Sequence, residues 1–397
     1  MSGLRAQRLA ARRSAHRRAM GRAVMVAVAS TVVAVGTATG MLSALDDRHD
    51  SDEARPALTG SPSRAPLPAV PSASASASTS ASTKKKASAS PSPTKKASPT
   101  PARTEPKKAA SVLYRHPASQ VLDWVSQNPA DRRTDLIESR IADRPAAVWF
   151  AEYAPATITA KVRAVTAGAA AQGRVPVVVV YGIPDRDCGG ASQGGAPDLD
   201  AYDAWIDRFA AGLGSGEVVV VLEPDSIAQA DCLSGAQRAD RFASLARAGR
   251  VLKAADAKAR VYYDAGHSGW NPPAKQAGLL KQAGAASPAS SDGVFSNVSN
   301  FHTTAAEIAY DRQVLAALGG PSSLGAVIDT SRNGNGAPAD GAWCDPDGRK
   351  IGRAPTLDTG EARIDGYLWV KLPGESDGCK GTPGTFSPSY AYELASS

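Results

Sequence analysis

The sequence predicts an α/β fold in which about seven parallel strands form a closed or nearly closed barrel. Residues 177–180 and 218–221 are valine runs without polar alternation. Such runs are typical of strands that are covered on both faces, as in parallel sheets. Helical patterns separate these strands from their neighbours, and an alternation of strand and helix favours a parallel arrangement.

The expected elements follow one another from Tyr114 onward. In the segment 199–213, Tyr202, Trp205, Ile206 and Phe209 share one stripe, which indicates an amphipathic helix. An open, doubly wound sheet is the alternative, but no Gly-x-Gly-x-x-Gly pattern supports it. Strands are expected at residues 147–150, 175–181, 217–222, 261–264, 293–297, 325–329 and 367–370, and helices at residues 156–172, 199–213, 235–255, 272–283 and 304–318.

Composition divides the chain into a leader (residues 1–50), a linker (51–110) and a folded domain (111–397). No Phe, Trp, Tyr or Cys precedes Tyr114, so only the last part can build a core. The linker consists largely of Ser, Ala, Pro and Lys repeats. A segment of this composition buries too little apolar surface to fold and is expected to stay extended.

The leader has the pattern of an export signal. Seven arginines precede an apolar run over residues 23–45, and a basic segment before an apolar one marks export with the basic part kept in the cytoplasm. The run is long enough to span a bilayer, and small residues near its end also suit a signal peptidase. A cleaved signal peptide and an uncleaved signal-anchor both remain open. Either places the folded domain outside the cell, secreted or tethered to the outer face of the membrane.

Charge follows the same division. Residues 1–110 carry 18 Lys and Arg against 6 Asp and Glu, whereas residues 111–397 carry 27 against 32. The folded domain is therefore mildly acidic and lacks the basic surface that nucleic acids require. We expect a monomeric domain without a nucleic-acid partner, and a membrane contact only through the leader if the leader is not cleaved.

The four cysteines all lie in the folded domain and are expected to form disulfides, because an exported domain meets oxidising conditions. Three pairings are possible. Cys188 with Cys232 and Cys344 with Cys379 is preferred, because each bond would join two neighbouring loops. Zinc binding is the competing use, but no Cys-x-x-Cys spacing supports it, so we expect neither a metal nor another cofactor.

Aspartates follow three expected strands at their carboxyl ends, where α/β barrels and open α/β sheets hold their active sites. These are Asp187, Asp225 and Asp264. A lone Asp after a strand is most often a helix cap or a turn residue, but three at one edge predict an acidic cleft. Neighbouring carboxyls cannot all ionise easily, so one is expected to keep its proton and act as a general acid. Arg186 is expected to keep Asp187 ionised.

Aromatic residues accompany these acids. Trp149, Tyr181, Trp270 and Trp343 end strands or lie in loops, where their rings could stack on the apolar faces of sugars. Trp205, in contrast, is expected in the core. Histidine motifs for a metal site and the Gly-x-Ser-x-Gly elbow of α/β-hydrolases are absent. Acids with aromatic platforms indicate glycoside hydrolysis by two carboxylates.

Six motifs stand in one order along the folded domain: the segment 179–195 with Tyr181, Arg186-Asp187-Cys188-Gly189 and Ser192; Val219-Val220-Val221-Leu222-Glu223-Pro224-Asp225-Ser226-Ile227-Ala228; Tyr263-Asp264-Ala265-Gly266-His267-Ser268-Gly269-Trp270; Val298-Ser299-Asn300-Phe301; Ser331-Arg332-Asn333-Gly334; and Trp369-Val370-Lys371-Leu372-Pro373-Gly374-Glu375-Ser376-Asp377-Gly378. In this order they resemble glycoside hydrolase family 6 cellulases over residues 114–397. The resemblance implies a distorted, TIM-like parallel β/α barrel of mostly seven strands, and hydrolysis with inversion.

The resemblance also implies roles for single residues. Asp225 matches the general acid, Asp187 the residue that tunes it, and Asp377 the proposed base, with a water chain as the alternative route for the proton. Both preferred cysteine pairs agree with the family pattern. The residues expected to contact substrate are Trp149, Tyr181, Arg186, Ser192, Asp264, His267, Trp270, Asn300, Trp343, Lys371 and Glu375.

The expected activity is that of an endo-β-1,4-glucanase, which cuts cellulose-type β-1,4-glucans internally. Cellobiohydrolases of the family carry extra loop residues that roof the active site, whereas the segments 300–330 and 333–365 are compact here. A cellobiohydrolase is the alternative. A non-catalytic glycan-binding protein on the same barrel is disfavoured, because every acid required for hydrolysis is present.

Overall fold

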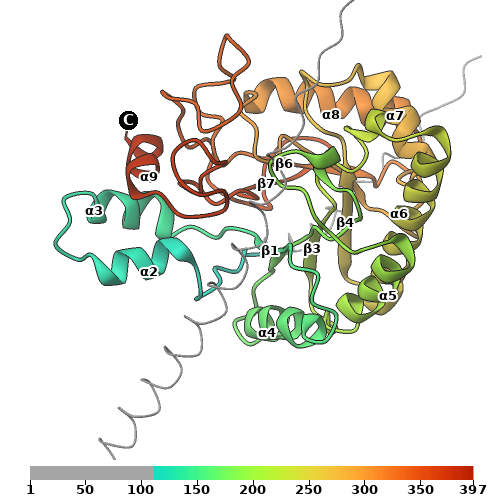
Figure 1. Cartoon of the computed structure of the whole chain (residues 1–397), viewed down its shortest axis with the longest axis horizontal. Coiled ribbons are helices and arrows are strands. Elements are labelled where there is room, and N and C mark those ends of the chain that lie inside the picture. Colours follow the sequence, from blue (N-terminus) through green and yellow to red (C-terminus); the bar gives the residue numbers. More distant parts are fainter. Residues whose placement is uncertain (1–110, 397) are drawn as a thin grey trace, which may run out of the picture. The chain divides into compact units, whose positions relative to one another are not determined.

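The computed structural model describes residues 111–396, so the expectations for the leader and the linker lie outside the described residues. Within this range seven parallel strands form one sheet in the order in which they occur along the chain (Figure 1). The class and the strand number are those expected from the sequence. The strands are β1 Val148–Phe150, β2 Val177–Val180, β3 Val218–Leu222, β4 Ala259–Asp264, β5 Gly293–Ser296, β6 Gly325–Asp329 and β7 Ile364–Leu368.

Helices connect successive strands from β1 to β6 and cover the outside of the sheet (Figure 1), whereas the segment from β6 to β7 contains no helix. The helix α6 begins with a capping box, in which Ser234 accepts from the Gln237 amide while the Gln237 side chain accepts from the Ser234 amide. Asp198 and Thr303 cap α5 and α8 in the simpler way, through one side-chain oxygen. The connecting helices are α4 Ile158–Ala170, α5 Leu199–Ala210, α6 Gly235–Ala255, α7 Pro273–Gln282 and α8 Thr304–Leu318.

The sheet curls into a distorted barrel whose seam lies between β7 and β1, since β1 pairs along its length with β2 and β7 with β6. Two hydrogen bonds bridge the seam. The Ala147 amide donates to the Trp369 carbonyl over 2.9 Å, and the Trp149 indole donates to the Val370 carbonyl over 2.7 Å. This arrangement confirms the distorted parallel barrel.

The valine runs are buried on both faces, as the lack of alternation predicts. Because successive side chains of a strand point to opposite faces, Val178 packs towards the helices together with Trp205, which is fully buried. Val179 packs into the barrel interior together with Tyr262. Two apolar layers therefore hold the sheet, one inside the barrel and one beneath the helices.

Besides two three-residue turns at the rim, η2 Asp187–Gly189 and η3 Ala230–Cys232, four short segments were not predicted from the sequence: α2 Gln120–Gln127, α3 Thr134–Ile137, the π-helical turn η1 Glu138–Ala142 and α9 Pro388–Ala395. They lie together on one side of the domain (Figure 1), where Val121, Ile141 and Ala391 pack around Trp369 in a third apolar cluster. Each has eight residues or fewer and stands outside the alternation of strand and helix, so periodicity gives a weak signal.

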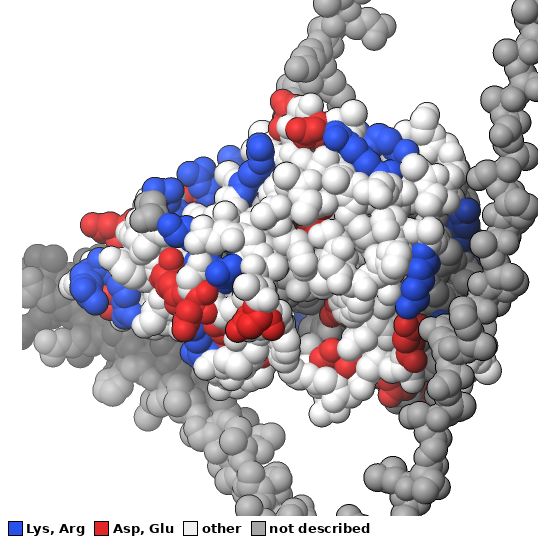
Figure 2. Space-filling model, turned by 90° about the horizontal axis from the view of Figure 1, so that it is seen from above, with Lys and Arg blue, Asp and Glu red and all other residues white. Residues whose placement is uncertain are grey.

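The surface of the domain carries both signs of charge. On the face seen in Figure 2, Lys and Arg side chains lie scattered among Asp and Glu side chains and do not merge into one basic surface. Of the helices between residues 111 and 396, none combines the length and the apolar composition that crossing a membrane requires.

Candidate active site

The turns after β2, β3 and β5 hold the backbone in a conformation that side chains rarely adopt. Such left-handed residues are uncommon outside glycine, and clusters of them accompany functional sites. Because these turns share the carboxyl-end rim of the barrel, that rim is the candidate active site. The residues with positive φ are Asp185, Asp187, Cys188, Glu223, Asp225, Asn297 and Ser299.

Asp225 lies in the turn after β3 and keeps part of its surface exposed. Within residues 111–396 its carboxyl group takes part in no hydrogen bond. Burial raises the pKa of Asp225 to about 8, with the charges of Asp264 and Asp187 acting in the same direction. The side chain is therefore largely protonated at neutral pH, and its proton is not committed to another protein group.

Asp264 supports this turn from below. It is the last residue of β4 and only 1% exposed. Its carboxylate accepts hydrogen bonds from the amides of Ile227, Ala228 and Gly266 over 2.8 to 3.0 Å. Burial raises the pKa of Asp264, although these amide bonds oppose the shift. Its carboxylate thus contacts the backbone of the Asp225 turn and of the turn after β4, and it does not face an open surface.

Glu223 ties this turn to the one after β2. Its buried carboxylate accepts from the amides of Gly182 and Ile183 over 2.9 to 3.1 Å. Burial raises the pKa of Glu223 to about 7, even though these amides oppose the shift. The turns after β2 and β3 are thus held together by a side chain inside the Glu-Pro-Asp-Ser segment.

Asp187 and Arg186 lie in the turn after β2 but do not pair. The Asp187 carboxylate accepts from the Ser192 amide over 2.7 Å and from its hydroxyl over 3.2 Å. The Arg186 guanidinium donates to the carbonyls of Ala151, Tyr181 and Ser192 and lies 4.4 Å from the centre of the Tyr181 ring. The contacts of Arg186 are therefore with backbone carbonyls, which fix the loop, and not with the Asp187 carboxylate.

The two disulfides are those preferred from the sequence. Cys188 and Cys232 join the turn after β2 to the short helix η3 Ala230–Cys232, which follows β3. Cys344 and Cys379 join two loops of the C-terminal part. Each disulfide thus lies next to one of the two groups of candidate acids.

A second group of charges surrounds Asp377 in the loop after β7. One oxygen of Asp377 lies 2.6 Å from the Arg332 guanidinium and 3.1 Å from the Asp345 amide, and the other lies 3.2 Å from the Lys371 ammonium. Lys371 also contacts Glu375 over 3.0 Å. The Arg332 side chain is fully buried. Asp377 is therefore held between two cations.

Asp345 organises this loop. Its carboxylate accepts from the Ser376 hydroxyl over 2.6 Å and from the amides of Asp377, Cys379 and Lys380 over 2.7 to 3.0 Å. Burial opposes ionisation, but the hydrogen bonds from Ser376 and from these amides hold the pKa of Asp345 at about 2. The Asp377 loop is thus shaped by a buried carboxylate, as the Asp225 turn is.

Trp149 and Tyr181 form an aromatic pair beside the acids. Their rings meet edge to face with centroids 5.3 Å apart. Burial raises the pKa of Tyr181, and so does the charge of Asp225, which shows that the phenol lies near this acid. Tyr181 is only 5% exposed, whereas Trp149 is half-buried.

Another set of rings follows β4. The His267 ring lies 5.2 Å from Trp270 and is stacked 4.3 Å from His302. Burial and the neighbouring His302 lower the pKa of His267 to about 4, so its imidazole is neutral at neutral pH. Asn300 is half-buried after β5, and Trp343 is 57% exposed in the C-terminal part.

The structure brings Asp187, Asp225 and Asp264 together, and it gathers Lys371 and Glu375 around Asp377. Four buried residues of the site were not among the expected site residues: Glu223, Asp329, Arg332 and Asp345. Glu223 and Asp329 stand at the carboxyl ends of strands, which is the position that predicted the other acids. Arg332 belongs to the motif Ser331-Arg332-Asn333-Gly334. Asp345 lies in a loop without a comparable signal.

Comparison with known proteins gives consistent matches. Residues 105–393 match the family described as glycosyl hydrolases family 6. The chain is 54% identical to endoglucanase 1 of Streptomyces sp. (strain KSM-9) over 71% of this chain and 77% of that protein. It is 50% identical to endoglucanase A of Thermobispora bispora over 72% of this chain and 62% of that protein. Exoglucanase 3 of Agaricus bisporus is 30% identical over 68% of each chain.

A solved structure agrees with these matches. The endoglucanase Cel6 from Mycobacterium tuberculosis, in complex with methyl-cellobiosyl-4-deoxy-4-thio-β-D-cellobioside, has a TM-score of 0.66 and 39% identity, and the match covers 72% of this chain and 97% of that one.

Proposed function

This chain belongs to the glycosyl hydrolases of family 6, and from that membership we propose that it is an endo-β-1,4-glucanase, which cuts cellulose-type β-1,4-glucans within the polymer. The observation that carries the proposal is the state of Asp225. A carboxyl group whose pKa is raised to about 8, and whose proton serves no other protein group among the described residues, is suited to general acid catalysis.

In the proposed reaction Asp225 donates its proton to the glycosidic oxygen while the bond from that oxygen to the anomeric carbon breaks. A water molecule attacks the anomeric carbon from the opposite face, which inverts its configuration. The proton lost by the water passes to Asp377, either directly or through a second water. Asp187 lies near Asp225, where its charge stabilises the positive charge that develops on the sugar.

The surroundings of Asp377 bear on how it takes part. Its oxygens already contact Arg332, Lys371 and the Asp345 amide. A proton accepted there would weaken the attraction to both cations. A direct transfer therefore has a cost, and the relay through a further water stays the alternative.

We propose the exposed parts of Trp149, Trp270 and Trp343 as platforms for sugar rings, because an indole face that is not covered by protein can stack on a pyranose. Polar contacts with substrate would come from the other residues expected from the sequence: Arg186, Ser192, His267, Asn300, Lys371 and Glu375. Tyr181 and Asp264 are more deeply buried, so their proposed part is to shape the cleft and to position Asp225.

We place the folded domain outside the cell. Two disulfides within it fit an oxidising compartment. In this proposal the leader is either removed, which gives a secreted domain, or kept as an anchor, which tethers the domain to the membrane. Mass spectrometry of the mature N-terminus distinguishes the two.

The test of endo action follows the viscosity and the reducing ends of carboxymethylcellulose together. Internal cuts shorten long polymers early, so we expect viscosity to fall steeply while few reducing ends appear. Steady release of cellobiose with little loss of viscosity would instead identify a cellobiohydrolase. Binding without any new reducing ends would identify a glycan-binding protein. Asp225→Asn serves as the inactive control in each assay.

Inversion has its own test. Proton NMR of the products, recorded before the sugars equilibrate, should show the α-anomer first. A β-anomeric first product would contradict the reaction proposed here.

A further inference from the structure

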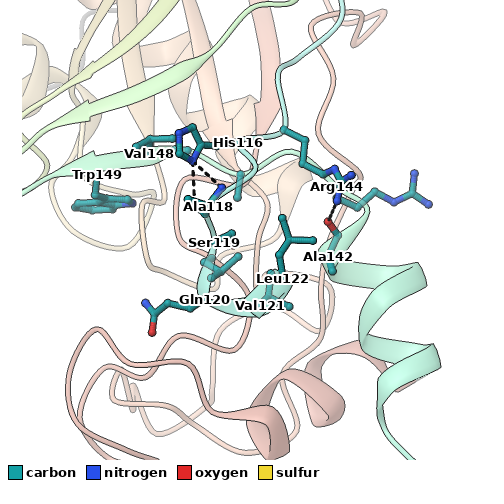
Figure 3. Close-up of a pocket in the computed structure, with 14 residues that line it drawn as sticks. His116, Ala118, Ser119, Gln120, Val121, Leu122, Ala142, Arg144, Val148 and Trp149 are labelled. Carbon is teal, nitrogen blue, oxygen red and sulfur yellow. Dashed lines mark hydrogen bonds between the residues drawn. The ribbon is translucent and has the colours of Figure 1, made fainter. Parts of the chain in front are cut away.

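A cavity of about 180 Å³ lies next to Trp149, and none of the candidate acids lines it (Figure 3). Its walls come from the first turn of α2, from the segment that leads into β1, and from Leu372. Figure 3 shows Ser119, Leu122, Arg144 and Trp149 around it. The cavity therefore sits beside the barrel seam, between the start of α2 and the segment that leads into β1.

Contacts connect this cavity to the candidate cleft. Trp149 lines it and also meets the ring of Tyr181, which lies near Asp225. Leu372 lines it too, and the preceding residue, Lys371, contacts Asp377. The cavity thus lies next to the candidate cleft and shares the Trp149 side chain with it.

The lining has the mixed character that a sugar requires. Leu122 and Trp149 supply apolar surface. The Ser119 side chain does not cap α2, and among the described residues neither its hydroxyl nor the exposed Arg144 guanidinium has a hydrogen-bond partner or an ion pair. No carboxylate lines the cavity. Free donors beside an apolar wall can bind the hydroxyl groups and one face of a pyranose.

We propose that this cavity binds one further glucosyl unit of the β-1,4-glucan, at the end of the substrate that lies over Trp149. The inference rests on the proposed glucanase function. The size agrees, because about 180 Å³ is six times the ~30 Å³ that a water molecule occupies in the liquid. The cavity thus has the volume of about six water molecules, which is of the order of one sugar ring.

Two variants alter the cavity from exposed positions, so that folding is disturbed little. Ala118→Trp places a large side chain at its wall, and Arg144→Ala removes a free donor. Their controls are Ala362→Trp and Arg140→Ala, which make the same changes at exposed positions that do not line the cavity. Melting temperatures of all four should stay close to that of the wild type.

The readout is the ratio of kcat/KM for cellohexaose to that for cellotetraose. We expect each cavity variant to lower this ratio about three- to tenfold, the scale of one hydrogen bond, and the bond cleaved in cellopentaose to shift. The controls should keep the ratio of the wild type. Equal losses on both substrates, or an unchanged ratio, would overturn the proposal.

Calorimetry on proteins that also carry Asp225→Asn separates this inference from the proposed function. Cellohexaose should bind more tightly than cellotetraose, and Ala118→Trp should remove the difference. That result would support binding of a glucosyl unit in the cavity even if no polysaccharide were cleaved. If the protein that carries Asp225→Asn alone bound both oligosaccharides equally, the cavity would not be a binding site for a glucosyl unit. The proposed glucanase function would be unaffected by that result.

Discussion

Asp225 and Asp377 are the same residue type in opposite surroundings. Asp225 lies in a buried turn with two other carboxyl groups near it, and among the described residues no group hydrogen-bonds its side chain. Asp377 lies between Arg332 and Lys371 and accepts an amide hydrogen. The rim therefore keeps Asp225 protonated, so that it can donate a proton, whereas it places Asp377 between two positive charges.

The two regions are nevertheless built in the same way. In each, a buried carboxylate gathers backbone amides and so fixes the loop that presents the candidate acid: Asp264 beneath Asp225, and Asp345 beside Asp377. In each, a disulfide joins two loops next to the acid. The difference between the acids therefore comes from the neighbouring charges and not from the way the loops are held.

The largest effect is expected for Asp225→Asn. Asparagine tolerates the left-handed backbone of this position but has no acidic proton. Activity on unactivated β-1,4-glucan should fall about 10²- to 10⁴-fold, the usual contribution of a general acid. A substrate with a good leaving group needs less protonation and should lose much less.

The matched control is Asp185→Asn, an exposed aspartate that also has positive φ, in the neighbouring turn. It should retain activity on both substrates. If Asp225→Asn lost equal activity on both substrates, Asp225 would not be the acid.

The next largest effect is expected when the Asp377 region loses a cation. Arg332→Met leaves Asp377 and Asp345 buried without this partner, which should lower the free energy of unfolding by about 3–5 kcal/mol. Urea denaturation measures the loss. The control is Arg312→Met, which breaks the 2.8 Å ion pair with Glu361 at the surface and should cost about 0–1 kcal/mol. Similar losses in the two variants would show that burial does not matter here.

The disulfides allow each region to be loosened separately. One variant replaces Cys188 and Cys232 by Ser, and a second replaces Cys344 and Cys379 by Ser. The disulfides that they remove join cysteines 44 and 35 residues apart in the sequence. Each change should lower the free energy of unfolding by about 2–4 kcal/mol. The first should also disturb the turns that carry Asp187 and Asp225, and the second the loop that carries Asp377. A loss well below 1 kcal/mol for either pair would contradict the claim that this disulfide stabilises the loops that it joins.

Much of this arrangement could be predicted from the sequence, because strong local patterns encode it. The bounds of α6, α8 and β6 agree with the expected ranges, since long periodic helices and unbroken apolar strands give clear signals. Strand β7 begins at Ile364 rather than at residue 367, because polar Asp365 and small Gly366 interrupt its apolar pattern. The acids at the ends of β2, β3 and β4 could be found from position alone.

The partners of these acids could not be predicted. The sequence places Arg186 beside Asp187, yet its side chain reaches past this neighbour to two carbonyls of its own turn and to the Ala151 carbonyl of a distant segment. Asp345 lies 32 residues from Asp377 in the sequence, and the contact between them depends on how two loops fold against each other. Such pairings arise from tertiary packing, which periodicity does not report.

The smallest effect is expected in the pH dependence, and it tests the cause of the difference between the two acids. Because Asp225 must be protonated to act, kcat/KM of the wild type should fall as pH rises through about 8. The charge of Asp187 helps to raise that pKa, so Asp187→Asn should move the alkaline limb to lower pH. Asparagine suits the left-handed backbone here as well, and its amide oxygen can still accept from the Ser192 amide.

Stability gives a second measure of the same carboxyl group. A pKa raised from 3.8 to about 8 means that the folded state binds the proton more tightly than the unfolded state. The contribution of Asp225 to the free energy of unfolding is therefore fully present below the unfolded pKa and is lost as pH rises towards about 8. Melting temperatures of Asp225→Asn should consequently depend less on pH across this range than those of the wild type, whereas Asp185→Asn should follow the wild type. Two results together would contradict this account. The alkaline limb of the pH profile would stay in place in Asp187→Asn, and the melting temperatures of Asp225→Asn would follow those of the wild type at every pH. Neighbouring charge and burial would then not set the proton affinity of Asp225.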